Sequence, residues 1–166
     1  MQRELIFLTF SVACFVAFVL QIVFRFDVQK SISDSYYRFK EYGQEKVFAI
    51  GIAAFSFPMF FVGGSVFMPL AAGLIGFVGA AASFNDRLQT KIVHYVGAVL
   101  GITFGLIDVI ICYEYWIPVL IATILALLIK FLTKNWLWWI EILFYFTIIS
   151  CKYFGIIQTE LAKIVF

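Results

Sequence analysis

Residues 91–113 read KIVHYVGAVLGITFGLIDVIICY, and this stretch decides the fold. It has the length of a helix that crosses a bilayer, which needs about 20 mostly apolar residues. Its small and polar residues recur in steps of 3, 4, 4, 3 and 4, which keeps them on one helical face. That face consists of His94, Gly97, Gly101, Gly105, Asp108 and Cys112. The central G-x-x-x-G-x-x-x-G pattern lets another helix backbone approach closely, so it predicts tight helix packing.

The composition of the whole chain points to lipid as its solvent. Of the 166 residues, 64% are hydrophobic and 13% are charged, against about 25% charged residues in soluble domains. The net charge is only +2, which gives no reason to expect a nucleic-acid partner. The three cysteines show no C-x-x-C spacing, and we interpret them as small buried apolar residues rather than metal ligands.

Apolar stretches divide the chain into six expected membrane spans. We expect an all-α, polytopic transmembrane bundle in which residues 1–166 form a single domain. The span at the N-terminus has a longer apolar core than a signal peptide, so we expect it to be retained. The expected spans are residues 5–24, 47–62, 65–84, 92–112, 116–131 and 136–157. Gly63 and Gly64 permit a tight turn between the second and third spans. In the third span, Gly73 and Gly76 add a second small face for helix packing.

The basic residues predict the orientation of the bundle. Six spans put the loops after spans one, three and five on the same side. Those loops carry nine of the twelve Lys and Arg residues, namely Arg25, Lys30, Arg38, Lys40, Lys46, Arg87, Lys91, Lys130 and Lys134. The positive-inside rule therefore places these loops in the cytoplasm and both termini outside, in a multi-pass protein of a prokaryotic inner membrane. Trp136, Trp138 and Trp139 are expected to form an interfacial aromatic belt.

The one sizeable loop, residues 29–46, predicts a short cytoplasmic interfacial helix. Ser31 or Ser33 would cap it, and Ile32, Tyr36 and Phe39 would share one face. We expect this face to lie among lipid headgroups. The segment is then either an amphipathic linker between two spans or a lid over a cavity that faces the cytoplasm.

Three segments carry a resemblance to known proteins: SISDSYYRF (31–39), FPMFFVGG (57–64), and the region from GFVGAAASFND (76–86) to KIVHYVGAVLG (91–101). Together they resemble a group of small six-helix prokaryotic membrane proteins of unknown function. That group is in turn distantly similar to ceramidase-like and opsin-like membrane folds. The resemblance implies a compact helical bundle and no particular activity. Ceramidase-like enzymes use several histidines around zinc, whereas His94 is the one histidine of this chain, so we expect no metal and no cofactor.

The last span carries a polar face that matches residues 91–113. Glu141, Tyr145, Ile148 and Lys152 follow one another in steps of 4, 3 and 4. Asp108 and Lys152 each lie 17 residues beyond the start of their span, at Lys91 and Asn135. At 1.5 Å per residue both lie about 25 Å along their helices. We therefore expect Asp108 and Lys152 to pair. The alternative is that Lys152 extends to the outer headgroups.

No nucleophile–base motif or phosphate-binding loop stands out, so the functional hypotheses remain broad. The leading hypothesis is a non-enzymatic bundle with a polar intramembrane site between the fourth and sixth spans, which binds or passes an ion, proton or small solute. Its candidate residues are Asp108, Lys152, Glu141, His94 and Tyr145. A second hypothesis is a homo-oligomeric or partner-gated pore with the glycine faces as subunit contacts. A third is a lipid-modifying enzyme that uses Asp86, His94 and Glu141.

Overall fold

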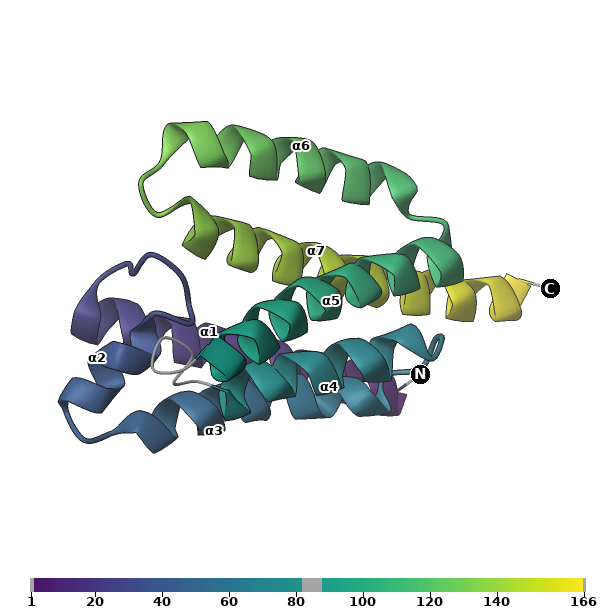
Figure 1. Cartoon of the computed structure of the whole chain (residues 1–166). Coiled ribbons are helices and arrows are strands. Elements are labelled where there is room, and N and C mark those ends of the chain that lie inside the picture. Colours follow the sequence, from purple (N-terminus) through teal and green to yellow (C-terminus); the bar gives the residue numbers. More distant parts are fainter. Residues whose placement is uncertain (1, 82–87, 166) are drawn as a thin grey trace.

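The computed structural model describes residues 2–81 and 88–165, and these residues form an all-helical bundle (Figure 1). Seven α-helices and one 3-10 helix are present in that part of the chain. They are α1 (Gln2–Phe26), α2 (Ser35–Glu41), α3 (Glu45–Ser56), η1 (Phe57–Phe61), α4 (Phe67–Ala80), α5 (Leu88–Tyr113), α6 (Trp116–Leu132) and α7 (Trp136–Val165). The all-α prediction is therefore confirmed for the described residues.

Three helices are long and apolar enough to cross a membrane. They are Gln2–Phe26, Lys91–Tyr113 and Trp136–Lys163. The other expected spans correspond to shorter elements: Phe67–Ala80 has 14 residues and Trp116–Leu132 has 17. Six helical segments thus lie where spans were predicted, while the number that cross a membrane stays a prediction. The expected turn of Asn85, Asp86 and Arg87 falls outside the described residues.

The expected second span is divided by a change of helix type. Residues 45–56 are α-helical, and residues 57–61 continue as a 3-10 helix. Pro58 lies at this change. Its ring has no N–H to donate to a carbonyl of the preceding turn, so the α-helical hydrogen-bond pattern cannot continue unchanged. The backbone around residue 56 therefore needs a hydrogen-bond donor from elsewhere in the bundle.

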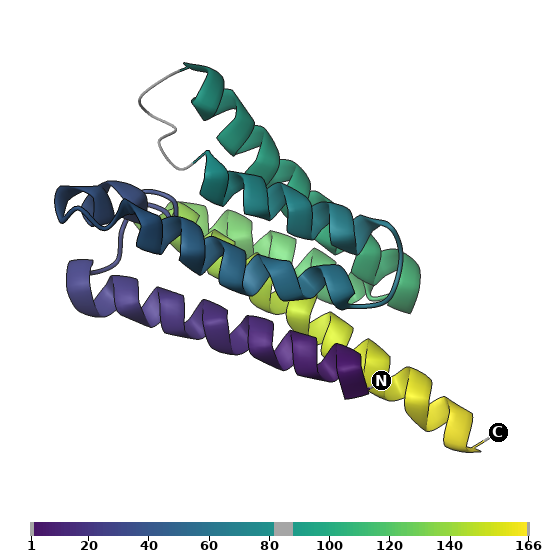
Figure 2. The ribbon, with the colours of Figure 1, turned by 90° about the horizontal axis from the view of Figure 1, so that it is seen from below.

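Helices α4 and α5 are packed against each other through glycine, as the pattern of residues 91–113 predicts (Figure 2). A Cβ atom at Gly97 would lie 3.0 Å from the carbonyl oxygen of Leu74, and one at Gly101 would lie 3.4 Å from that of Ala71. Gly105 instead faces Ile148 of α7. Close helix approach is therefore found within a single chain at Gly97 and Gly101. It is not found at Gly73 and Gly76, whose nearest neighbours are the Phe60 side chain at 3.4 Å and Ser56 Oγ at 3.8 Å.

The short helix α2 lies against the bundle and not among headgroups. Phe39 is completely buried and Tyr36 is 9% exposed. Both belong to a cluster with Phe18, Phe48 and Trp138. The expectation that the aromatic face of this helix meets lipid is therefore wrong, because α1, α3 and α7 cover that face. For the same reason Trp138 does not belong to an aromatic belt, although Trp136 and Trp139 are exposed.

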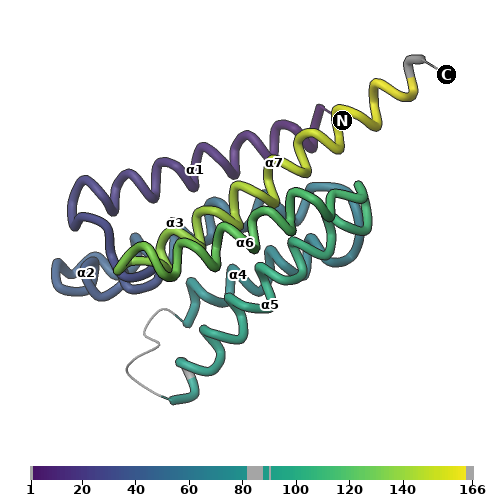
Figure 3. The backbone as a smooth tube through the Cα atoms, turned by 90° about the horizontal axis from the view of Figure 1, so that it is seen from above, coloured from purple at the N-terminus to yellow at the C-terminus, as the bar shows by residue number. Residues whose placement is uncertain are grey.

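Helix α6 lies along α7 and stands away from α5 (Figure 1). Its buried residues are Ala122 and Ala126, whose small side chains face the rest of the bundle. Its outer face is made of exposed leucine and isoleucine, a composition suited to lipid contact. The C-terminal end of α7 projects beyond the other helices (Figure 3).

Candidate functional site

Asp108 of α5 and Lys152 of α7 form an ion pair inside the bundle. Lys152 Nζ lies 2.6 Å from Asp108 Oδ2, and both side chains are 0% exposed. The contact expected from their equal depth is thus present. The ammonium group points to the carboxylate, so the alternative in which Lys152 extends to the headgroups does not describe this structure.

The same two charges hold the turn between η1 and α4. Lys152 Nζ donates to the carbonyl oxygen of Gly63 at 2.6 Å. Asp108 Oδ1 accepts from the backbone N–H of Ser65 at 3.0 Å and from its hydroxyl at 2.7 Å. Gly64 has φ +139°, and a Cβ there would overlap Lys152 Nζ, so only glycine fits. We call residues 62–66 with Asp108 and Lys152 the clamp.

Helix α1 completes the clamp from the other side of the turn. Glu4 Oε1 accepts from the backbone N–H of Gly63 at 3.0 Å. The turn is therefore held by carboxylates on two helices and by an ammonium group on a third. Irregular backbone inside a helical bundle needs partners for its polar groups, and the clamp with Glu4 supplies them for Gly63 and Ser65.

Tyr145 of α7 belongs to a second polar contact, with α1 and α3. The Ser11 hydroxyl is fully buried and donates to the carbonyl oxygen of Phe55 at 2.6 Å. Tyr145 Oη lies 2.7 Å from Ser11 Oγ and donates to it, because the single Ser11 proton is already used. Phe55 is one turn before Pro58, so Ser11 supplies a donor where the helix pattern is interrupted.

Glu141 of α7 holds a third irregular segment, residues 27–34, which we call the strap. Glu141 Oε2 accepts from the backbone N–H of Ile32 at 2.6 Å. Asn135 and the backbone N–H of Trp138 donate to carbonyl oxygens of the same strap, at Val28 and Lys30. Within the strap, Asp34 N–H donates to Ser31 Oγ at 3.0 Å, which stabilises the turn before α2. The N-cap of α2 is Asp34 and makes no side-chain cap hydrogen bond, so the expectation that Ser31 or Ser33 caps this helix is wrong.

His94 of α5 lies at the end of α4. It is 2% exposed and hydrogen-bonds with the backbone of Val78 and Ala81, at the last turn of that helix. The carbonyl groups of a helix C-terminus have no partner within the helix. His94 therefore supplies a partner for the C-terminal turn of α4.

The polar contacts of the five residues predicted to share one site fall into four groups. Asp108 pairs with Lys152, while Tyr145 bonds with Ser11, Glu141 with the strap and His94 with the end of α4. His94 and Glu141 nevertheless line the same cavity. Sequence reasoning did not identify Ser11, Glu4 or Ser65 as their partners. The sequence does contain a signal, because Pro58 and the Gly63-Gly64 pair mark backbone that needs partners from outside its own helix.

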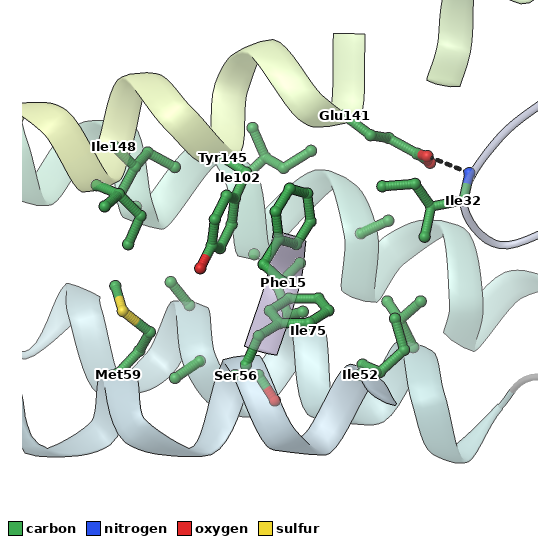
Figure 4. A pocket seen from close by; sticks show the side chains of 18 of the residues that line it. Phe15, Ile32, Ile52, Ser56, Met59, Ile75, Ile102, Glu141, Tyr145 and Ile148 are labelled. Atoms are coloured by element: carbon green, nitrogen blue, oxygen red, sulfur yellow. Dashed lines mark hydrogen bonds between the residues drawn. The ribbon is translucent and has the colours of Figure 1, made fainter. Parts of the chain in front are cut away.

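Two cavities lie beside the strap and Glu141. The larger, of about 360 Å³, lies between α5 and α7 and is bounded by the strap; we call it the crevice. The smaller, of about 120 Å³, lies deeper among α1, α3, α4, α5 and α7; we call it the inner pocket (Figure 4). Ser33, Ala98, Ile102 and Glu141 line both. These four residues therefore form a wall that the two cavities share.

Polar and apolar side chains both line the crevice. The apolar ones include Leu106, Leu137, Ile140 and Phe144, and the polar ones come from the strap, α5 and α7: Ser31, Ser33, Asp34, His94, Tyr95, Thr103 and Glu141. Lys and Arg are absent from the described residues that line it. Within the described part of the chain, no group of three His, Cys, Asp or Glu side chains could hold a metal ion.

Comparisons with known proteins give no relative for this geometry. No protein-family model matches the chain, and neither curated proteins nor solved structures provide a significant match. The resemblance to six-helix prokaryotic membrane proteins therefore stays a prediction. Any function must be argued from the cavities and the contacts around them.

Proposed function

We propose that this chain is a multi-pass membrane protein that binds a small amphiphilic solute in the crevice. The observation that carries the proposal is the crevice itself, which is lined by apolar side chains together with polar ones from the strap, α5 and α7. A volume of about 360 Å³ is within the range of about 300–1,000 Å³ that ligand pockets occupy. This develops the small-solute form of the leading hypothesis.

The dimensions of the crevice suit a molecule with a head and a chain. His94 and Leu106, which both line the crevice, are 12 residues apart on α5, which corresponds to about 18 Å along the helix. A polar head would lie near Ser31, Asp34 and Glu141. An apolar chain would lie between α5 and α7, beside the exposed side chains of Tyr95 and Val99.

The clamp supports solute binding less well than the crevice does. Asp108 and Lys152 are absent from the described residues that line either cavity, and their charges are turned towards each other and the clamp turn. An ion or proton pathway through them would have to break these contacts. The pore hypothesis also loses its main support, because Gly97, Gly101 and Gly105 are covered by helices of the same chain.

Binding can be measured with a defined probe. Native mass spectrometry in detergent should show one molecule of 1-monolauroylglycerol retained by the purified protein. Ala98→Phe places a ring on the crevice wall and should abolish retention. The matched control is Val96→Phe on the same helix, an exposed residue that is not among the described residues lining either cavity.

A second blocking variant separates loss of binding from loss of folding. Thr103→Trp introduces a large side chain at an exposed position beside the crevice, so it should block the probe without disturbing the core. Retention of the probe by both Ala98→Phe and Thr103→Trp would overturn the proposal. So would equal loss of retention in Val96→Phe.

The proposal includes the membrane orientation expected from the basic residues. With six spans, the strap, α2 and the start of α5 lie in the cytoplasm and both termini lie outside. Single cysteines at positions 40 and 88, in a background without Cys14, Cys112 and Cys151, should resist a membrane-impermeant thiol reagent in intact cells. They should react once the membrane is opened. Labelling of both positions in intact cells would reverse the orientation.

A further inference from the structure

The inner pocket is almost entirely apolar. Its wall includes Phe55 and Met59 from the α3–η1 region, Met68 and Ile75 from α4, and Ile102 from α5. Figure 4 shows Tyr145 and Ile148 of α7 facing Met59 and Ile75 across it. Methionine adapts its shape easily to what it contacts, so this wall can fit an apolar group closely.

The two largest polar side chains in this wall are already engaged. Tyr145 donates to Ser11, and Glu141 accepts from the backbone of Ile32 (Figure 4). A buried water needs two to four polar partners, whereas apolar cavities of about 150 Å³ stay dry and bind benzene or xenon. The inner pocket, at about 120 Å³, is close to that size.

We propose that the inner pocket is a second subsite, which binds a compact apolar group carried by the solute of the crevice. Scaled from benzene at about 150 Å³, the pocket holds about five carbon atoms. Suitable groups are a branched alkyl end or a small ring, and a charged group is excluded by the apolar wall. The inference rests on the proposed function for its natural ligand, but the pocket's selectivity can be tested separately.

The route into the inner pocket follows from the wall that it shares with the crevice. Ala98 is the smallest residue of this wall and Ile102 is only half-buried. The shared wall at Ala98 and Ile102 is therefore the place where a group lying in the crevice would enter the inner pocket. Glu141 lies in the same wall and is held back by its hydrogen bond with the strap.

The test uses probes whose position can be seen directly. Crystals of the full chain would be exposed to xenon and, separately, to iodobenzene, both of which give anomalous diffraction signals. We expect a peak for each within the inner pocket, bounded by Ile75, Ile102 and Tyr145. No peak there in the wild-type protein, or ordered water in its place, would overturn the inference.

Variants check that the peak reports this pocket. Ala72→Met fills the inner pocket and should remove both peaks, whereas Ala53→Met on the exposed side of α3 should leave them unchanged. Ile75→Ala enlarges the pocket and should strengthen the iodobenzene peak, which gives a second reading if Ala72→Met does not fold. Peaks that persist in Ala72→Met, or that weaken in Ile75→Ala, would contradict the inference.

The outcome is distinguishable from that of the proposed function. Retention of 1-monolauroylglycerol depends on the crevice, while the xenon and iodobenzene peaks depend on the inner pocket alone. Probe retention without the peaks would leave the crevice function standing and remove the second subsite. Peaks without retention would leave an apolar pocket whose ligand does not come through the crevice, and would overturn the inference as stated.

Discussion

Buried carboxyl groups have different kinds of partner in the clamp and in the strap region. In the clamp, a carboxylate and an ammonium group lie 2.6 Å apart with no exposure, and neither is among the described residues that line the two cavities. In the strap region, Glu141 has a backbone N–H as its partner instead of a cation, and both cavities border it. The Asp108 carboxylate is thus neutralised by a neighbouring cation, whereas the Glu141 carboxyl group is held by a hydrogen bond from the strap and lies beside both cavities.

Removing the cation of the clamp should have the largest effect. Lys152→Met leaves Asp108 buried without its ammonium partner, which costs about 3–5 kcal/mol in comparable pairs. We expect the free energy of unfolding in detergent to fall by that amount. The matched control is Lys163→Met in the exposed part of the same helix, which should leave the unfolding midpoint unchanged.

A double-mutant cycle tests whether the clamp acts as a pair. Asp108→Asn with Lys152→Met should be less destabilised than the sum of the two single variants, with a coupling above about 1 kcal/mol. Coupling near zero would mean that the two side chains contribute independently. The ion pair of the clamp would then add no coupling energy to distinguish it from the strap region.

Gly101→Leu tests the helix contact that joins the two regions. A Cβ at Gly101 would already lie 2.8 Å from the Ile75 side chain, and overpacking of a tight core costs about 1–3 kcal/mol. Gly76→Ala is the control, because its nearest neighbour is Ser56 Oγ at an ordinary 3.8 Å. It should be neutral or stabilising by up to about 1 kcal/mol, from helix propensity. Equal unfolding midpoints for Gly101→Leu and wild type would show that this contact is not tight.

Glu141→Ala should destabilise the strap region by less than Lys152→Met destabilises the clamp. The Ile32 N–H loses its acceptor, which costs about 1–3 kcal/mol for a buried group. Glu141→Gln keeps a side-chain oxygen at the same place, so most of the stability should return. Hydrogen exchange of the Ile32 amide gives the local reading. If that amide exchanges equally in wild type and Glu141→Ala, the hydrogen bond does not hold the strap.

Tyr145→Phe should have the smallest effect on stability. It removes the hydrogen bond with Ser11 but leaves Ser11 bound to the Phe55 carbonyl, so we expect about 0.5–1.5 kcal/mol. Tyr42→Phe, at a tyrosine that is 64% exposed, is the control and should unfold like wild type. If Tyr145→Phe lowers the free energy of unfolding as much as Lys152→Met does, the hydrogen bond of Tyr145 stabilises the fold as strongly as the ion pair of the clamp.

The sequence predicted the helices and the ion pair better than it predicted the site. Apolar length and glycine spacing are local properties, so α1, α5 and α7 could be recognised, and equal depth on two helices was enough to pair Asp108 with Lys152. The hydrogen-bond partners of Glu141, Tyr145 and His94 could not be predicted, because they depend on the three-dimensional position of irregular backbone. Three segments have backbone groups that need hydrogen-bond partners from other helices: residues 27–34, the Pro58 region and the end of α4. Only the fold determines which side chain reaches each of them. The burial of Phe39 and Trp138 was missed for the same reason, since aromatic residues suit both a core and a headgroup region.

The clamp joins residues that are synthesised at very different times. Gly63 and Lys152 are 89 residues apart, so at about 5–20 residues per second roughly 4–18 s pass between their synthesis. Until α7 is synthesised, the 62–66 turn and Asp108 lack their ammonium partner, and the Asp108 carboxylate stays uncompensated. The clamp can therefore close only once Lys152 has been made, after all the helices that precede α7.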